Sequence, residues 1–276
     1  MILQVPRYDL GLSTLLQRLG SYDPTCRWNP QVLVKAFWTP QGPCTLALRQ
    51  RGEQIEVETV GDGSDWCRSW LPRMFSFPPQ ELDPDCPRRD LRQLSRELAG
   101  LRIGPVAWTF DVAMAYVLQQ RVAFRDAARS FGRLVHDHSS PAPGPLSLRL
   151  PLSPQEWLKV GGDRIQQAGV DAKRARTLLR VARLGLEFGP DQLARLPGIG
   201  PWTQQSVAGY GFGDPDAVPI GDLHLPRVVG QFLAGDPGAD DERMVELLEP
   251  YRGLRFRVIQ WIMASSQRRA FATRDL

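Results

Sequence analysis

In the first third of the chain, apolar residues recur at every second position, which is the pattern of half-buried β-strands. The segments Gln31–Pro40, Thr45–Gln50 and Gln54–Val60 follow this pattern, and turn residues separate them. They predict an antiparallel meander, with short helices at Leu12–Leu19 and Ser64–Leu71. On the first strand the apolar face consists of Val32, Val34, Ala36 and Trp38.

Beyond the proline-rich stretch Phe77–Pro87, the apolar spacing changes to three and four residues, which is typical of amphipathic helices. We therefore predict an α+β protein in two parts. Residues 1–87 are expected to form a small N-terminal antiparallel β domain, and residues 88–276 an all-helical domain. The predicted helices cover Leu91–Leu101, Phe110–Gln120, Phe124–His136, Pro154–Val160, Lys173–Leu186, Pro190–Leu196, Pro201–Gly209, Leu223–Leu233, Asp241–Leu248 and Leu254–Arg268.

Local signals add detail to the helical part. Thr109 is the residue type that caps helix N-termini, so we expect it to cap the second predicted helix. Phe124 starts an apolar stripe and is expected to face inward. The segment Ser139–Pro154 is rich in proline and is expected to be a surface connection.

Composition narrows the class of protein. The chain has 276 residues, of which 42% are apolar and 23% charged, so wholesale disorder is excluded. No apolar run reaches the roughly 18 residues that a membrane helix needs, and the N-terminus lacks a signal-peptide pattern. We therefore expect a cytoplasmic protein that does not bind membranes.

The net charge of +4 is unevenly distributed. Residues 1–87 carry 8 basic and 10 acidic side chains, whereas residues 88–276 carry 26 and 20. This excess permits nucleic-acid binding in the second part, although a solvated arginine-rich face gives the same count.

The cysteines exclude one class of cofactor. Four cysteines stand singly in the first third of the chain, without a paired cysteine or histidine at ligand spacing. They indicate reduced, buried thiols, and we predict no metal site. Since no cysteine follows Cys86, a C-terminal iron–sulfur cluster is excluded. The four are Cys26, Cys44, Cys67 and Cys86.

The most specific motif is Leu196-Pro197-Gly198-Ile199-Gly200, between two predicted helices. Two glycines let the backbone turn tightly and approach a ligand, and the amides that open the next helix favour an anion such as a DNA phosphate. Ordinary glycine caps of a helical hairpin are the alternative. The loop begins with Leu-Pro and ends with glycine followed by Pro201, which constrains the backbone more than a glycine cap requires. This favours the phosphate-binding hairpin.

Asp222 stands twenty-two residues beyond Gly200, just before a predicted helix. Capping that helix is one interpretation. The other is catalytic, because a carboxylate there suits the stabilisation of a developing cation or the activation of water. The hairpin upstream favours the catalytic interpretation.

The hairpin followed by this aspartate resembles the helix-hairpin-helix DNA glycosylase superfamily, and further segments resemble its 3-methyladenine DNA glycosylase II branch. The resemblance covers residues 105 to about 262 and implies a monomer that acts on double-stranded DNA containing alkylated bases. The segments that carry it are Leu196–Thr203, Gly221–Asp222, Leu118–Val122, Pro141–Pro145 and Glu249–Gly253.

The lysines and cysteines refine this resemblance. Bifunctional members carry a Schiff-base lysine at the hairpin position that is Trp202 here, and Lys35, Lys159 and Lys173 all lie elsewhere. This predicts a monofunctional enzyme in which water is the nucleophile. Branches with a C-terminal four-cysteine cluster are excluded. We expect no cofactor, although a monovalent cation in the hairpin stays open.

The resemblance also implies site residues. Asp222 would be the catalytic carboxylate, sufficient for a cationic alkylated purine, which is a good leaving group. Trp202 would stack on that base, or else pack the hairpin as a core residue. Gln120 and Arg121 would fill the gap left by base extrusion, unless Arg121 is simply a solvated helix-end residue. The hairpin residues implied to contact DNA are Gly198, Ile199, Gly200 and Thr203.

Two pocket assignments depart from the family pattern. The family's second stacking tryptophan aligns with Gln260, beside Trp261, so either Trp261 takes the role or the pocket is less aromatic. Phe124 would line the pocket or belong to the core. Two rival functions stay open: a glycosylase for deaminated or oxidised purines, and a non-catalytic DNA-binding protein.

Overall fold

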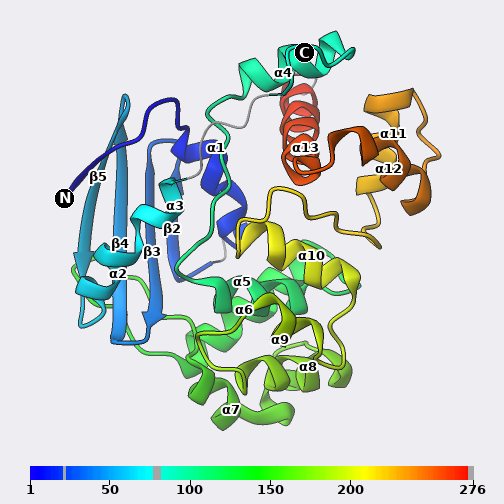
Figure 1. Cartoon of the computed structure of the whole chain (residues 1–276). Helices are drawn as coiled ribbons and strands as arrows, with labels where there is room; N and C mark the ends of the chain where they lie inside the picture. The colour runs from blue at the N-terminus through cyan, green and yellow to red at the C-terminus, as the bar shows by residue number, and fades with distance from the viewer. Residues whose placement is uncertain (21–22, 77–81, 273–276) are drawn as a thin grey trace.

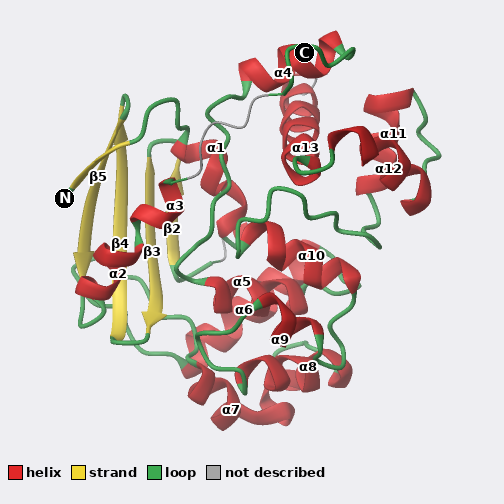
Figure 2. Cartoon of the chain, viewed as in Figure 1, coloured by secondary structure: helices red, strands yellow, loops and turns green. Residues whose placement is uncertain are grey.

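The structure, a computed structural model, describes residues 1–20, 23–76 and 82–272. The alternating segments form a five-stranded antiparallel sheet in the order β1-β5-β4-β3-β2 (Figure 2). The predicted meander is confirmed as β3, β4 and β5. Two short edge strands, β1 and β2, were not predicted because three or four residues are too few to establish an alternation. The strands are β1 Ile2–Gln4, β2 Cys26–Asn29, β3 Val32–Thr39, β4 Gly42–Arg51 and β5 Gln54–Val60.

The segment predicted to be a surface connection instead covers one face of the sheet. Ala142, Leu148 and Leu150 are buried against Val34 and Ala36 of β3. Two hydrogen bonds fix it there: Thr45 Oγ1 donates to the Pro143 carbonyl at 2.7 Å, and Trp38 Nε1 to the Pro151 carbonyl at 2.8 Å. The prediction was wrong because it relied on the proline content and gave no weight to the widely spaced apolar residues, which pack on the sheet.

The other face of the sheet packs against short helices and the start of the helical part (Figure 1). Phe37 of β3 contacts Trp108 with ring centroids 5.4 Å apart, and one buried apolar cluster includes residues from both sides of position 87. The division into domains at 87 stays a prediction, and part of the predicted boundary stretch lies outside the described residues.

Helices in this first part are short. The predicted helix Leu12–Leu19 is divided into an α-helical and a 3₁₀ piece, and the chain turns after the second helix into a third that was not predicted. The elements are α1 Leu10–Thr14, η1 Leu15–Gln17, α2 Ser64–Trp70 and α3 Pro72–Phe75.

After residue 88 the described chain is helical, as predicted. A second apolar cluster joins α4 to α11, α12 and α13, away from the sheet (Figure 1). The helices are α4 Arg89–Glu97, α5 Thr109–Leu118, α6 Phe124–His138, α7 Pro154–Gln167, α8 Ala172–Ala182, α9 Pro190–Ala194, α10 Pro201–Tyr210, α11 Leu225–Ala234, α12 Asp241–Leu248, η3 Glu249–Tyr251 and α13 Arg255–Ala272.

Two local predictions in this part were wrong. Thr109 is the first residue of α5 rather than its cap, and its hydroxyl donates to the carbonyls of Val106 and Gly211. Phe124, expected to face inward, is 49% exposed because α6 begins at the surface beside the N-terminal segment. By contrast, the four cysteines are free and buried, as predicted.

Within the described residues, no helix is long and apolar enough to cross a membrane, and no cluster of histidine, cysteine or acidic side chains is suited to a metal ion.

Candidate active site and nucleic-acid interface

The hairpin motif lies between α9 and α10. Gly198 has φ of +97°, and a Cβ there would stand 2.2 Å from Thr177 Oγ1, so this position requires glycine. Gly200 precedes α10 with extended backbone, and Pro201 opens the helix. Because Pro201 lacks an N–H, the backbone donors at this helix start are those of the hairpin and of the next residues in α10.

The loop after α5 is tied directly to this hairpin. Gln120 Nε2 donates to the Gly198 carbonyl at 3.0 Å and to Thr203 Oγ1 at 2.9 Å. Thr203 is buried, whereas Arg121 is exposed and adopts φ of +56°, a left-handed conformation that is uncommon for arginine. Gln120 therefore holds the loop, and Arg121 is its projecting residue.

Asp222 lies two residues before His224, which is the N-cap of α11, so the capping position predicted for Asp222 belongs to His224. Asp222 Oδ1 accepts from the amides of His224 and Leu225, both at 2.9 Å. Its Oδ2 accepts from Trp202 Nε1 at 2.8 Å. The carboxylate is thus fixed by three N–H donors, two from the helix start and one from α10.

Trp202 is the first member of a group of aromatic rings. Tyr116 of α5 contacts Trp202 edge-on at 5.4 Å and stacks on Tyr210 at 5.7 Å. Tyr210 in turn contacts Phe256 at 4.9 Å. The sequence reasoning did not single out Tyr116, Tyr210 or Phe256, since no local motif distinguishes them from core residues.

The structure brings Gln260, not Trp261, to this aromatic group. The Tyr210 hydroxyl donates to Gln260 Oε1 at 3.1 Å. Trp261 is 1% exposed and packs in the cluster of α4 and α11–α13, and its Nε1 has no hydrogen-bond partner within the described chain. A one-residue step on α13 turns the side chain by about 100°, so neighbours face different ways.

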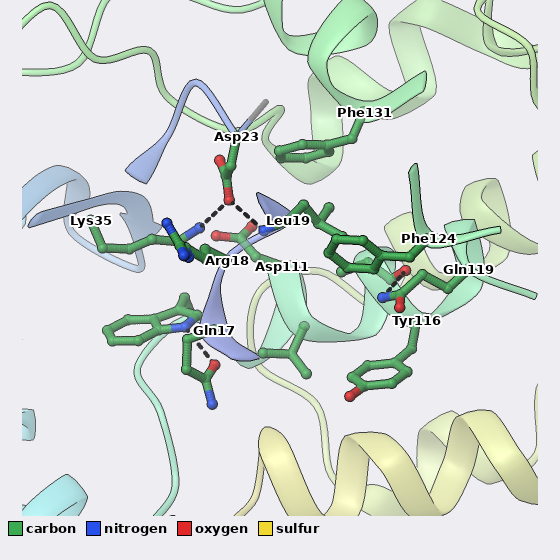
Figure 3. Close-up of a pocket in the computed structure, with 13 residues that line it drawn as sticks. Gln17, Arg18, Leu19, Asp23, Lys35, Asp111, Tyr116, Gln119, Phe124 and Phe131 are labelled. Atoms are coloured by element: carbon green, nitrogen blue, oxygen red, sulfur yellow. Dashed lines mark hydrogen bonds and ion pairs between the residues drawn. The ribbon is translucent and has the colours of Figure 1, made fainter. Parts of the chain in front are cut away.

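Tyr116 also lines a half-enclosed cavity of about 140 Å³ (Figure 3). Its walls come from the N-terminal segment, β3, α5 and α6, and Phe124 is one of its exposed edges. The cavity is lined by Gln17, Arg18, Leu19, Asp23, Lys35, Trp108, Asp111, Val112, Ala115, Tyr116, Gln119, Phe124 and Phe131.

The fold of the chain is similar to the folds of solved DNA glycosylases. The chain is similar to a 3-methyladenine DNA glycosylase from Archaeoglobus fulgidus, with a TM-score of 0.79 and 18% identity over 95% of this chain and 96% of that one. It is also similar to an 8-oxoguanine glycosylase/lyase from Clostridium acetobutylicum, with a TM-score of 0.73 and 11% identity over 96% and 93%. The predicted fold class is confirmed.

A comparison of sequences also finds a similar protein that is named as a DNA repair enzyme. A Mycobacterium tuberculosis protein named "Probable bifunctional transcriptional activator/DNA repair enzyme AlkA" is 33% identical over 151 residues. This match covers 49% of the chain and 30% of the relative, so the chain spans under a third of that protein. No family model matches the chain. The predicted resemblance to the 3-methyladenine branch is confirmed.

Proposed function

We propose that the protein is a monofunctional DNA glycosylase that hydrolyses the N-glycosidic bond of alkylated purines in double-stranded DNA. The observation that carries this proposal is Asp222, fixed by the amides of His224 and Leu225 and by the Trp202 indole. The hairpin that would hold the DNA backbone directly precedes the helix that contains Trp202. The names of two similar proteins, a DNA repair enzyme and a 3-methyladenine DNA glycosylase, support the same reaction class.

The chemistry follows from the charge of the substrate. An alkylated purine carries positive charge and leaves readily, so the enzyme mainly stabilises the sugar oxocarbenium ion and positions water. Asp222 would perform both roles, since its oxygens are already oriented by N–H donors. The face of Trp202 would bind the cationic base, an attraction of roughly 0.5–2 kcal/mol.

Extrusion of the base requires that the gap in the duplex be filled. Arg121 is exposed on the loop that Gln120 anchors to the hairpin. We propose that its planar guanidinium enters the gap and stacks there, while the hairpin amides at Ile199 and Gly200 bind a backbone phosphate. The enzyme would act as a monomer, without a cofactor.

The absence of lyase activity is also a proposal. Lys35 is buried beside Asp23, and neither Lys159 on α7 nor Lys173 on α8 belongs to the hairpin. Without a lysine nucleophile, borohydride should trap no covalent complex with damaged DNA. A trapped complex would contradict the monofunctional mechanism. This test matters because the fold is also similar to that of a glycosylase/lyase.

The direct test is incubation with methylated DNA and detection of free 3-methyladenine and 7-methylguanine. We expect release by the wild type and a loss of at least a hundredfold in Asp222→Asn, which removes the negative charge. Glu246→Gln on α12 makes the same charge change at an exposed site and serves as control. Equal release by Asp222→Asn and wild type would refute the mechanism.

Two other outcomes identify the rival functions. Release of hypoxanthine or 8-oxoguanine in place of methylated purines would identify a glycosylase for deaminated or oxidised bases. Tight binding of abasic DNA without release of any base would identify a non-catalytic DNA-binding protein.

A further inference from the structure

The cavity that Tyr116 lines contains a second carboxyl group that the proposed chemistry does not use. Asp111 lies in the first turn of α5, and its side chain lines the cavity. Its buried Oδ2 has no hydrogen-bond partner among the described residues. Buried polar groups are nearly always satisfied, so an orphaned oxygen in a cavity wall calls for a ligand or water.

The charged neighbours of Asp111 are already engaged with one another. Asp23 accepts from the Leu19 amide at 3.0 Å and from both the amide and the hydroxyl of Thr25. Lys35 Nζ donates to Thr25 Oγ1 at 2.9 Å and lies 3.7 Å from Asp23 Oδ2. In Figure 3 Asp111 lies beside this pair, without a dashed line to it.

Arg18 and Tyr116 complete the set of titratable or charged groups that line the cavity with Asp111. The Arg18 guanidinium lies over the Trp28 ring, 4.3 Å from its centroid. Burial raises the pKa of Asp111 to about 7, Asp23 adds to the rise, and Lys35 opposes it. Near neutral pH a large share of Asp111 is therefore protonated, and the neutral carboxyl offers both a donor and an acceptor.

The position of the cavity connects it to the proposed site. Tyr116 forms one wall, and the same ring contacts Trp202, which donates to Asp222. The volume of about 140 Å³ is close to that of an engineered cavity of about 150 Å³ that binds benzene. The space thus suits one six-membered ring, with Phe124, Phe131 and Trp108 supplying aromatic walls.

We propose that this cavity receives the outer ring of the extruded purine and that protonated Asp111 hydrogen-bonds its Watson–Crick edge. This inference rests on the proposed function, which brings a flipped base to Trp202. Adenine presents an N6–H donor beside the N1 acceptor, and hypoxanthine an N1–H donor beside the O6 acceptor. A neutral carboxyl matches either edge with one donor and one acceptor. Asp111 is thus a specificity-determining residue that recognises purines as a class.

The test measures binding of free bases to the DNA-free protein by tryptophan fluorescence, with adenine and hypoxanthine as probes. Benzimidazole, which has the shape of a purine without the edge, is the control ligand. At pH 6 we expect Asp111→Val to weaken adenine and hypoxanthine binding roughly ten- to a hundredfold and to leave benzimidazole unchanged. Asp111→Asn keeps one donor and one acceptor and should bind adenine within a few-fold of wild type.

The pH dependence separates recognition from a structural role. Wild-type affinity for adenine should fall about tenfold per pH unit above 7, whereas Asp111→Asn should be flat between pH 6 and 8. Asp126→Asn, at an exposed position on α6, is the matched control and should behave as wild type. Circular dichroism of each variant verifies that it is folded. If Asp111→Val does not fold, the pH dependence of Asp111→Asn against that of the wild type still tests the proposal.

The outcomes distinguish this inference from the proposed function. Equal adenine binding by wild type and Asp111→Val, or no binding of either purine, overturns the inference even if methylated purines are released from DNA. Binding that depends on Asp111, combined with no base release, supports the cavity assignment and refutes the glycosylase activity.

Discussion

At the scale of single residues, the site depends on the contact between Trp202 and Asp222. The indole N–H is the only side-chain donor to the carboxylate among the described residues, since the other two donors are backbone amides. Trp202 therefore has two separable roles in the proposal: its ring face binds the base, and its N–H orients Asp222.

Trp202→Phe separates these roles, because it keeps an aromatic face and removes the N–H. A hydrogen bond to a charged group contributes about 1.5–3 kcal/mol, so we expect single-turnover base release to slow ten- to a hundredfold. DNA affinity should change little. Trp70→Phe on α2, remote from the hairpin, is the matched control. An unchanged rate in Trp202→Phe would mean that the hydrogen bond does not position Asp222.

Asp111 gives a pH-dependent prediction for stability. Its pKa is about 7 in the folded protein and about 3.9 in an unfolded chain. A raised folded pKa means that the neutral form is favoured on folding, so this group's contribution to stability is lost as pH rises from about 4 to 7. Thermal unfolding should therefore show a smaller decrease between pH 5 and 8 for Asp111→Asn than for the wild type. Parallel curves would contradict the raised pKa.

The candidate residues differ in how far the sequence revealed them. Asp222 and Trp202 belong to a local motif with fixed spacing, so both could be named in advance. Tyr116 and Tyr210 meet Gln260 only in the folded chain, from three helices. In the sequence both tyrosines are ordinary helical residues, and only the family resemblance indicated Gln260. Asp111 looked like a common acidic residue of a first helical turn, since its distinguishing property is a missing partner.

At the scale of elements, the hairpin depends on one glycine and tolerates change at the other. Gly198 has a left-handed backbone and packs against Thr177 of α8, whereas a Cβ on Gly200 would meet nothing within 4 Å. The contact with Thr177 therefore fixes the position of the hairpin loop against α8. Gln120 then ties the Arg121 loop to the same glycine's carbonyl.

This difference provides a paired test. Gly198→Ala should destabilise the protein by about 1–3 kcal/mol, because the new Cβ both requires positive φ and overlaps Thr177. DNA affinity should fall with it, since the loop must move. Gly200→Ala should retain stability within about 0.5 kcal/mol. Chemical denaturation and fluorescence anisotropy measure the two quantities, and equal effects at both glycines would contradict this account of the loop.

Prediction of elements from the sequence succeeded where periodicity ran long enough. The helix predicted to end at Val160 is interrupted directly after that residue, because Gly161 has φ of +73°. The rest of α7, up to Gln167, was not predicted. The sheet-covering segment 139–154 could not be predicted, since its apolar residues contact β3 over about a hundred positions of sequence. Such long-range packing leaves no local pattern.

At the scale of the whole molecule, the N-terminal sheet is part of the structure that shapes the site. Gln17 donates to the Tyr210 carbonyl at 3.0 Å and accepts from Trp108 Nε1 at 3.1 Å. It thereby links η1 to α10 and to Trp108, the N-cap residue of α5. The cavity that Tyr116 lines exists because this N-terminal segment and β3 close one side of it.

Continuity of the apolar core predicts cooperative unfolding. Phe37 of β3 is fully buried and contacts Trp108, so Phe37→Ala should destabilise sheet and helices together, by about 3–5 kcal/mol. Far-ultraviolet circular dichroism, which reports the helices, and tryptophan fluorescence should give coincident transitions in wild type and variant. Val60→Ala, at an exposed position of β5, is the control and should change stability by less than about 0.5 kcal/mol. If the sheet unfolded first and left a helical intermediate, residues 1–87 would be an independent domain. The cavity lined by Tyr116 would then be lost in that intermediate, while the hairpin would still bind DNA.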